Sequence, residues 1–417
     1  MRRIEMAKVL GYQISETSMK LLTLLFYYRG MTALQLAKIY FKSHNPTAVQ
    51  KSSVHNYLRK LKDQKLVTSK KLDGDNYVGS LYYLTQSGLE VVKSLLNIED
   101  GQTGTGYILA NENKEDTQAD LEYGIYKPPM EQIHHHLILI DFFIHLRLMP
   151  NQQVDHRLSM YASKEYEYNG KEAKIRPDAE VVLPYDRHYC IEIDRATESH
   201  SQLIQKFENY RHYFEYAEEI NEKLPTAIVF VTDEKQYQYG MNRRWTNVLA
   251  AYLKTMGDYA LKVNLFMLPL NKVEHFIRFE TYRPQLNRKV QTLLEKTLIQ
   301  KGNYKDVQTF KQPTDYSSID YMIAFTQTKY HVYFVRVAYE YDASIFSGFH
   351  HFINNLGDIH RKQQTPYKPS GVSQAIFYTD ERPFLPDYMR KNYDLPQEFL
   401  SHLELLSQHL SMYKLPL

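Results

Sequence analysis

Apolar residues recur every three or four positions through three segments of the first hundred residues. This is the period of a helix with one buried face, and it predicts helices over residues 18–30, over residues 32–41 and from residue 47 onward. Thr47 and Gln50 have the spacing of a capping box, which marks the start of the third helix. The buried face of that helix is predicted to hold Val54, Leu58 and Leu61.

After the third helix the pattern changes to that of strands. Residues 66–72 and 77–84 flank the turn sequence Asp73-Gly74-Asp75-Asn76, which is typical of a β-hairpin, and residues 89–96 predict a last helix. This order is typical of a winged helix-turn-helix, which has two helices, a basic third helix, a two-stranded wing and a last helix. The third helix of that fold enters the DNA major groove. We therefore predict a winged-helix DNA-binding domain over residues 1–98, the alternative being a winged helix used for protein contacts. Its expected DNA-facing residues are Gln50, Lys51, Ser52, His55, Asn56, Arg59 and Lys60 on the helix and Lys70 and Lys71 on the wing.

Charge is unevenly distributed along the chain. Residues 1–98 contain 15 Lys and Arg against 6 Asp and Glu, a net charge of +9, so the other residues carry −6 of the total of +3. A basic first domain on an acidic body indicates a polyanionic partner, and we expect double-stranded DNA. Residues 99–124 are polar and mostly acidic, which predicts a linker.

Residues 125–297 alternate between helical and strand patterns. Ranges predicted as helices are 131–148, 199–216 and 235–256, and ranges predicted as strands are 161–168, 175–183, 188–194, 226–232 and 263–268. The α-β-β-β-α-β order predicts an α/β domain. The first helix contains His134, His135 and His136. Successive helical residues point about 100° apart, so these three cannot chelate one ion, and we expect packed or polar histidines, one of which helps to position DNA or a carboxylate.

Carboxylates gather near the ends of two of these predicted strands. Asp178 follows Arg176-Pro177, and Glu192 and Asp194 share one face of the strand over 188–194. If the strands are neighbours, the acids converge, and clustered like charges need a cation. Carboxylate oxygens suit Mg²⁺ or Mn²⁺, so Asp178 and Glu192 are predicted metal ligands for phosphodiester cleavage. The alternative is an ion network of these acids with nearby arginines and lysines.

The same residues resemble the PD-(D/E)xK nuclease core. Pro177-Asp178 resembles the first half of that motif and Glu192-Ile193-Asp194 the second. The resemblance implies that Asp178 and Glu192 hold the metal, and that a lysine in the third position of the triplet orients or activates the attacking water. Asp194 stands at that third position, so either Asp194 is a further ligand or Lys206 supplies the cation. The predicted catalytic residues are accordingly Asp178, Glu192, Asp194 and Lys206.

A stripe of polar residues follows on the next predicted helix. Gln202, Lys206 and Tyr210 are spaced at i, i+4 and i+8, so they share one helix face. We expect this face to bring Lys206 towards the carboxylates, and Gln202 and Tyr210 towards the DNA backbone.

Taken together, these features resemble the replication-relaxation family of bacterial plasmids and mobile elements. The resemblance covers about the first 270 residues and depends on the winged-helix pattern, the helix with His135, Arg176-Pro177-Asp178, Glu192-Ile193-Asp194-Arg195 and the Lys206-x-x-x-Tyr210 spacing. It implies a function in plasmid replication and in relaxation of plasmid DNA.

Residues 298–417 repeat the α/β pattern in a degenerate form, the alternative being convergence of two ordinary α/β units. Residues 318–323, 333–337 and 375–381 correspond to the strands around 178, 189–193 and 227–234. Because Arg336 replaces Glu192, no metal site is expected in this second nuclease-like domain. A helix over 396–413 is predicted to form a homodimer surface with Phe399, Leu403, Leu406 and Leu410.

Several classes of protein are excluded by the sequence. Cys190 is the lone cysteine, which excludes an intrachain disulfide and a cysteine-based zinc cluster. The chain has no Gly-x-x-x-x-Gly-Lys-Ser/Thr loop and no run of eighteen apolar residues, so we expect no nucleotide cofactor, no membrane partner and a cytoplasmic location. Two functions remain: a sequence-directed DNA-binding protein of plasmid or mobile-element replication or regulation with a nuclease-like domain, or a Mg²⁺- or Mn²⁺-dependent nickase or endonuclease acting through Asp178 and Glu192.

Overall fold

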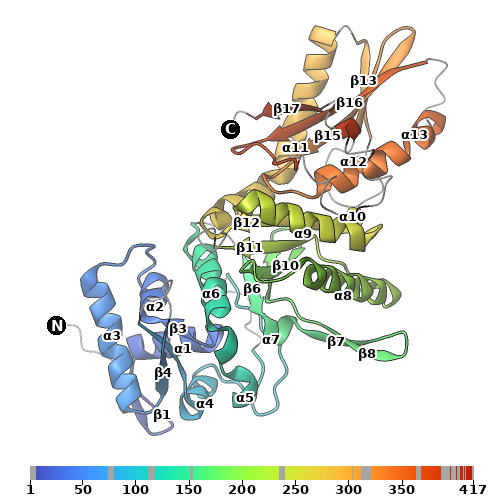
Figure 1. Ribbon diagram of the computed structural model, residues 1–417. Coiled ribbons are helices and arrows are strands. Elements are labelled where there is room, and N and C mark those ends of the chain that lie inside the picture. Colours follow the sequence, from blue (N-terminus) through green and yellow to red (C-terminus); the bar gives the residue numbers. More distant parts are fainter. Residues whose placement is uncertain are drawn as a thin grey trace. The chain divides into compact units, whose positions relative to one another are not determined.

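The computed structural model describes most of the 417 residues: 6–73, 79–110, 118–150, 154–233, 240–302, 304–310, 321–362, 368–386, 395, 401, 404–406, 408 and 410–415. These residues divide into two compact units (Figure 1). The first unit comprises residues 1–163 and 176–186, and the second comprises residues 164–175 and 187–417. Both contain helices and β-strands, which confirms the predicted mixed α/β class.

The first unit begins with four helices and short strands. They are β1 (Met6–Val9), β2 (Tyr12–Ser15), α1 (Glu16–Tyr28), β3 (Met31–Thr32), α2 (Ala33–Tyr40), α3 (Ala48–Asp63), β4 (Val67–Lys71), β5 (Ser80–Leu84) and α4 (Gln86–Leu95). The helices and the β4–β5 pair confirm the sequence prediction, whereas β1, β2 and β3 were not predicted. The strands β3, β5 and β4 form one antiparallel sheet in that order. Gly74, Asp75 and Asn76 of the predicted turn lie outside the described residues.

Local capping fixes where α3 begins. The hydroxyl of Thr47 accepts the Gln50 backbone N–H, and the Gln50 side chain accepts the Thr47 N–H, so the predicted capping box is present. Val54, Leu58 and Leu61 are buried as expected. Because these three residues face the interior, the remaining positions of α3 face outward.

The rest of the first unit is built around a buried helix. Its elements are α5 (Tyr123–Tyr126), the 3₁₀ turn η1 (Met130–Gln132), α6 (Ile133–Leu148), β6 (Asp155–Leu158), α7 (Ser159–Ala162) and β9 (Ala179–Leu183). The strands β6 and β9 pair antiparallel, with Leu158 opposite Ala179. The expected strand over 161–168 was wrong at its start, because residues 159–162 are helical. The expected strand over 175–183 is interrupted at Pro177, which has no N–H to donate to a sheet.

The second unit contains a parallel set of strands covered by helices. Its first elements are β7 (Lys164–Tyr168), β8 (Lys171–Ile175), β10 (Arg187–Asp194), α8 (His200–Glu219), β11 (Ala227–Thr232), α9 (Met241–Met256), α10 (Tyr259–Lys262) and β12 (Asn264–Pro269). The strands β10, β11 and β12 are parallel neighbours. Phe207 of α8 contacts Phe230 of β11 and Tyr252 of α9, so both helices pack on the same apolar face. The predicted alternation of strands near 188–194, 226–232 and 263–268 with helices between them is confirmed, whereas β8 and α10 were not predicted.

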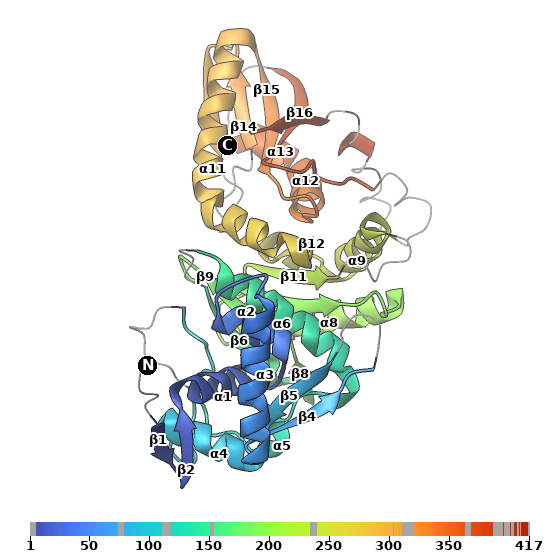
Figure 2. The same cartoon turned by 90° about the vertical axis from the view of Figure 1, so that its left-hand side faces the viewer.

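A second sheet follows the long helix α11 (Val273–Gly302). Its elements are β13 (Asp306–Phe310), β14 (Tyr321–Phe325), β15 (Lys329–Val337), α12 (Ser344–Asn354), α13 (Leu356–Lys362), β16 (Lys368–Tyr378) and β17 (Leu410–Lys414), with the strands in sequence order. In Figure 2, α11 runs along one side of this sheet, and α12 and α13 lie on the other. The strands β15, β16 and β17 are parallel, like β10, β11 and β12. The sequence analysis matched residues 333–337 with 189–193 and residues 375–381 with 227–234. Residues 333–337 lie in β15 and 189–193 in β10, and the second pair of segments begins in β16 and in β11.

The predicted C-terminal helix does not extend to residue 413. Residues 410–414 form β17, which pairs with β16, because strand pairing satisfies backbone groups that β16 would otherwise leave exposed. Leu406 is buried in the hydrophobic core of its own unit. Phe399, Leu403 and residues 318–320 lie outside the described residues. Within the part of the chain that the structure describes, no helix combines the length and apolarity that a membrane crossing requires.

Candidate DNA-binding surface and carboxylate site

The helix α3 presents a continuous polar surface to solvent. The predicted residues Lys51, Ser52, His55, Asn56, Arg59 and Lys60 are all exposed. Gln50 is half-buried because its side chain completes the capping box described above. In Figure 1, α3 lies along the outside of the first unit. The exposed charged residues of α3 are the bases Lys51, Arg59, Lys60 and Lys62 and the acid Asp63, so the helix offers net positive charge to an approaching ligand.

The strands β4 and β5 continue this basic surface. Lys70 and Lys71 at the end of β4 are both exposed. Lys62 of α3 donates a hydrogen bond to the Ser69 hydroxyl at 2.8 Å, which ties the helix to β4. The His55 ring lies against Tyr82 of β5, with ring centroids 6.4 Å apart. The helix α3 and the β4–β5 pair therefore form one surface within a single packed unit.

Asp178 is held by a histidine of the apolar helix. The His135 Nε2 atom lies 3.0 Å from an Asp178 carboxylate oxygen, and both side chains are mostly buried. This contact confirms the expectation that one of the three consecutive histidines positions a carboxylate. His136 points into the core, where its Nε2 lies 3.1 Å from the Gly30 carbonyl oxygen, and burial lowers its pKa to about 3. The neighbouring histidines therefore have different environments, as their helical spacing requires.

Glu180, two residues after Asp178 in the chain, is neutralised within the first unit. Its carboxylate pairs with the Arg157 guanidinium and accepts a hydrogen bond from the Tyr107 hydroxyl. Arg157 lies directly opposite Glu180 in the β6–β9 pair, where cross-strand charges of opposite sign stabilise a sheet. Glu180 is thus part of a structural ion pair.

Glu192 lies in the second unit, whereas Asp178 lies in the first. Its side chain is 4% exposed on β10. Lys206 of α8 donates to Oε2 at 2.9 Å, and the Tyr210 hydroxyl donates to Oε1 at 2.5 Å. Lys206 thus reaches the carboxylate as its i, i+4 spacing with Tyr210 predicted. Tyr210 differs from the prediction of a DNA-backbone contact, because it is 2% exposed and its hydroxyl points at Glu192.

Asp194 is neutralised by an arginine that the sequence analysis missed. Arg244 of α9 donates to both carboxylate oxygens of Asp194, each at 2.7 Å, and both side chains are buried. The Ala196 backbone N–H donates to the same carboxylate at 3.0 Å. Arg244 is fifty residues away in sequence, so no local pattern indicates this pair. A carboxylate with a bidentate arginine is a structural ion pair, which corresponds to the ion-network alternative for this residue.

A third carboxylate joins these two ion pairs. Glu198 lies 2.9 Å from the Lys206 ammonium and 3.8 Å from the Arg244 guanidinium. Lys206 therefore bridges Glu198 and Glu192, and Arg244 bridges Glu198 and Asp194. The network has three acids and two bases, a net charge of −1. Gln202 lies at the start of α8, where its side chain caps the Ser199 N–H at 2.7 Å.

The second sheet lacks this arrangement. Arg336 of β15 occupies the position that corresponds to Glu192, and it is buried. A Cβ atom added at Gly348 of α12 would lie 2.8 Å from the Arg336 Nη2 atom, so the glycine leaves room for the guanidinium. The strand acid Glu192 thus corresponds to an arginine in this sheet, and a glycine of the adjacent helix packs against its guanidinium.

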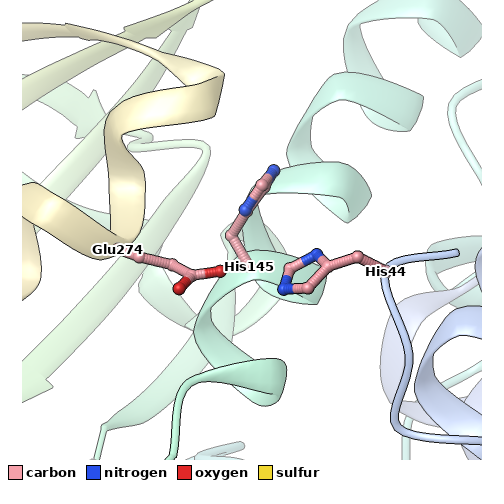
Figure 3. Close-up of side chains that lie close together, drawn as sticks. All are labelled: His44, His145 and Glu274. Carbon is pink, nitrogen blue, oxygen red and sulfur yellow. The ribbon is translucent and has the colours of Figure 1, made fainter.

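Two further histidines, outside the run 134–136, lie close together in the first unit. His44, between α2 and α3, and His145, near the end of α6, have ring centroids 5.4 Å apart (Figure 3). The sequence analysis did not single them out, because they are about a hundred residues apart in the chain. Two imidazoles supply half of the four ligands of a typical zinc site, so the pair by itself does not form a metal centre.

Comparison with known proteins gives one match. Residues 22–228 match a family model described as replication-relaxation. This segment begins in α1 and ends in β11, so it includes α3, the His135–Asp178 contact, Glu192 and Lys206. Arg244 lies beyond it. No curated protein and no solved structure matches the chain.

Proposed function

Residues 22–228 make this chain a member of the replication-relaxation family, and from that premise we propose that it acts in plasmid or mobile-element replication as a sequence-directed double-stranded DNA-binding protein. In this proposal residues 1–98 form a winged helix-turn-helix, and the domain that contains Glu192 is nuclease-like. The observation that carries the proposal is the exposed basic face of α3 beside the exposed lysines of β4.

The proposed docking follows from which α3 residues are exposed. An α-helix fits the major groove of B-DNA, and short polar side chains near its start can reach base edges. Lys51, Ser52 and Asn56 occupy this part of α3. Arg59 and Lys60 follow one turn later, and Lys70 lies on the wing, so these three are placed to contact phosphates. Phosphate contacts supply affinity and base contacts supply sequence preference.

Titration of fluorescent duplex DNA with the full-length protein at several salt concentrations tests this function. The variant Arg59→Gln/Lys60→Gln removes two charges from α3. The matched control, Arg288→Gln/Lys289→Gln, removes the same two residue types from exposed, adjacent positions on α11. We expect the α3 variant to bind at least about tenfold more weakly and to reduce the slope of log affinity against log salt by about 2, since each phosphate contact contributes about 0.9. The control variant should bind like the wild type.

Two results of this titration would contradict the proposal. One is equal loss of affinity in the α3 variant and in the α11 control, which would assign the effect to net charge alone. The other is wild-type binding that does not weaken as salt rises. A selection from a random duplex pool then tests sequence preference, which Asn56→Ala should alter without abolishing binding.

A second candidate function is a Mg²⁺- or Mn²⁺-dependent DNA nickase or endonuclease acting through Asp178 and Glu192. The favouring observation is the contact between Lys206 and Glu192. The PD-(D/E)xK motif usually has a lysine at the position where this chain has Asp194, and Lys206 of α8 brings a lysine to the carboxylate instead. Glu192 fits a hard cation chemically, because carboxylate oxygens are the ligands that Mg²⁺ and Mn²⁺ prefer in proteins. A bound cation would stabilise negative charge developing on the phosphate. Lys206 would orient the attacking water, and Tyr210 would hold the Glu192 carboxylate in place.

Nicking of supercoiled plasmid in the presence of Mg²⁺ or Mn²⁺ tests this second function. Asp178→Asn and Glu192→Gln should each reduce the rate by at least about tenfold. Glu219→Gln, at an exposed position near the end of α8, is the matched control and should leave the rate unchanged. If the wild type does not nick, or if both site variants nick at the wild-type rate, the enzymatic function is excluded and the DNA-binding function stands alone.

A further inference from the structure

A cavity of about 200 Å³ lies within the first unit. It is bounded by the start of α6, the end of β6 and the segment that leads into β9. Its polar lining includes Arg29, Gln132, His135, Ser159, Arg176 and Asp178, together with the buried His136, and apolar side chains complete the wall. Gln132 and Arg176 are exposed, so the cavity opens to solvent on their side.

Arg29 is a buried cation in this wall. Its side chain is 7% exposed, and it donates hydrogen bonds through Nε to the Tyr126 carbonyl and through Nη2 to the carbonyls of Ile125 and Lys127. Among the described residues, none accepts a hydrogen bond from Nη1. Three carbonyl dipoles satisfy two of the guanidinium nitrogens, but they do not neutralise a buried positive charge. Burial, together with the nearby Arg176, lowers the pKa of Arg29 to about 10, which still leaves it charged at neutral pH.

The backbone at Arg29 adopts an unusual conformation. Its φ of 60° is left-handed, although it carries a side chain and is followed by Gly30. A helix usually places glycine at such a position, because other residues are strained there. The residue with this left-handed backbone, at the end of α1, is also the one whose guanidinium forms part of the cavity wall. Strain of this kind clusters at ligand sites.

Three other side chains bring uncommitted donors to the cavity. Within the described ranges, no hydrogen bond or ion pair is formed by the Arg176 guanidinium, the Gln132 side-chain amide or the Ser159 hydroxyl. The Asp178 carboxylate in the same wall contacts His135 at 3.0 Å. Two arginines and one aspartate give the cavity a charge of +1 with His135 neutral, and +2 with it protonated. The wall is therefore suited to an anion that accepts several hydrogen bonds.

We propose that this cavity is a phosphate-binding site, in which Arg29 and Arg176 neutralise the phosphate and Gln132 and Ser159 donate to its oxygens. The volume favours a phosphate with part of its sugar, because pockets for drug-sized ligands begin at about 300 Å³. The binding of phosphate is argued from the cavity alone. The further step, that this phosphate belongs to a DNA strand, rests on the function proposed above.

Calorimetric titration of the full-length protein tests the site. The probes are inorganic phosphate, deoxyadenosine monophosphate, and a short single strand of DNA with and without a 5′-phosphate, all at constant ionic strength. Arg176→Gln is the principal variant, since the exposed side chain has no structural contact to lose among the described residues. Arg278→Gln, an exposed arginine of α11, is the matched control. Arg29 is left unchanged because its three carbonyl contacts support the segment around α5.

We expect wild type and Arg278→Gln to bind phosphate equally, and Arg176→Gln to bind it at least about tenfold more weakly. Ser159→Ala should weaken binding to a smaller extent, through loss of one neutral donor. If the DNA strand shows the same dependence on Arg176, the phosphate comes from DNA. If phosphate and the mononucleotide depend on Arg176 but the strand does not, the site takes free anions and its link to DNA is wrong.

The proposal is overturned if no probe binds, or if Arg176→Gln binds every probe as tightly as the wild type. Failure of the DNA-binding function would instead appear as unaltered duplex affinity in the Arg59→Gln/Lys60→Gln variant. The two outcomes are therefore separable.

Discussion

Two buried histidines predict how the stability of the first unit depends on pH. His136 of α6 is 3% exposed, and His156 of β6 is 0% exposed. The His156 Nε2 atom lies 3.1 Å from the Tyr28 hydroxyl, and its ring stacks on Phe143 with centroids 4.6 Å apart. Burial lowers the pKa of each histidine to about 3, because the charged form loses its hydration in the core.

The sign of the effect follows from proton linkage. As the pH falls below about 6.5, an unfolded chain protonates these histidines while the folded chain keeps them neutral. Protonation therefore favours the unfolded state, and stability is lost between pH 6.5 and about 3. Between pH 7 and pH 5 each histidine should cost about 2 kcal/mol, and the pair about 4 kcal/mol.

Urea unfolding at pH 7 and pH 5 measures this loss, with hydrogen exchange in peptides from α6 and β6 reporting on the first unit. His136→Gln and His156→Gln should each reduce the difference between the two pH values by about 2 kcal/mol. The measured quantity is the difference between the free energies of unfolding of one variant at pH 7 and at pH 5. A substitution that destabilises the variant equally at both pH values therefore does not change this difference. His55→Gln, at an exposed position on α3, should leave the difference unchanged. If both core variants keep the full difference, the assignment of acid sensitivity to these histidines is refuted.

Three further predictions concern stability of the folded chain, measured by chemical denaturation. Arg244→Met removes the guanidinium that pairs with the buried Asp194 carboxylate and should destabilise the second unit by about 3–5 kcal/mol, and wild-type stability would contradict the importance of the pair. Tyr210→Phe removes the hydrogen bond to Glu192 and should cost about 1.5–3 kcal/mol, while an unchanged midpoint would show that this contact contributes nothing. Gly88→Ala places a Cβ atom 2.0 Å from a backbone carbonyl oxygen, so it should cost about 1–3 kcal/mol or more, and a variant as stable as the wild type would mean that the backbone moves freely there.

The sequence determined much of the local structure, because helix periods and caps depend on neighbouring residues. Thr47 and Gln50 predicted where α3 begins, and the spacing of Val54, Leu58 and Leu61 predicted which face it exposes. The i, i+4 spacing of Lys206 and Tyr210 likewise placed both side chains on one face of α8, where both reach Glu192.

Local patterns failed where a local preference competed with long-range pairing. The spacing of Phe399, Leu403, Leu406 and Leu410 predicted a helix up to residue 413. Residues 410–414 nevertheless form β17, because β16 offers a row of backbone partners. Pro177 divides a strand that the apolar pattern predicted to be continuous, and the two parts belong to different units.

Only the tertiary structure decided which charged groups meet. Asp194 pairs with an arginine fifty residues away, and Asp178 pairs with His135 from a helix forty-three residues earlier. Arg29 lines a cavity with Arg176, although α1 and β9 are far apart in the sequence. Periodicity shows which side of an element is buried, but it does not show which element packs against that side. The chemistry of a buried charge depends on that partner, so it emerges only when the chain is folded.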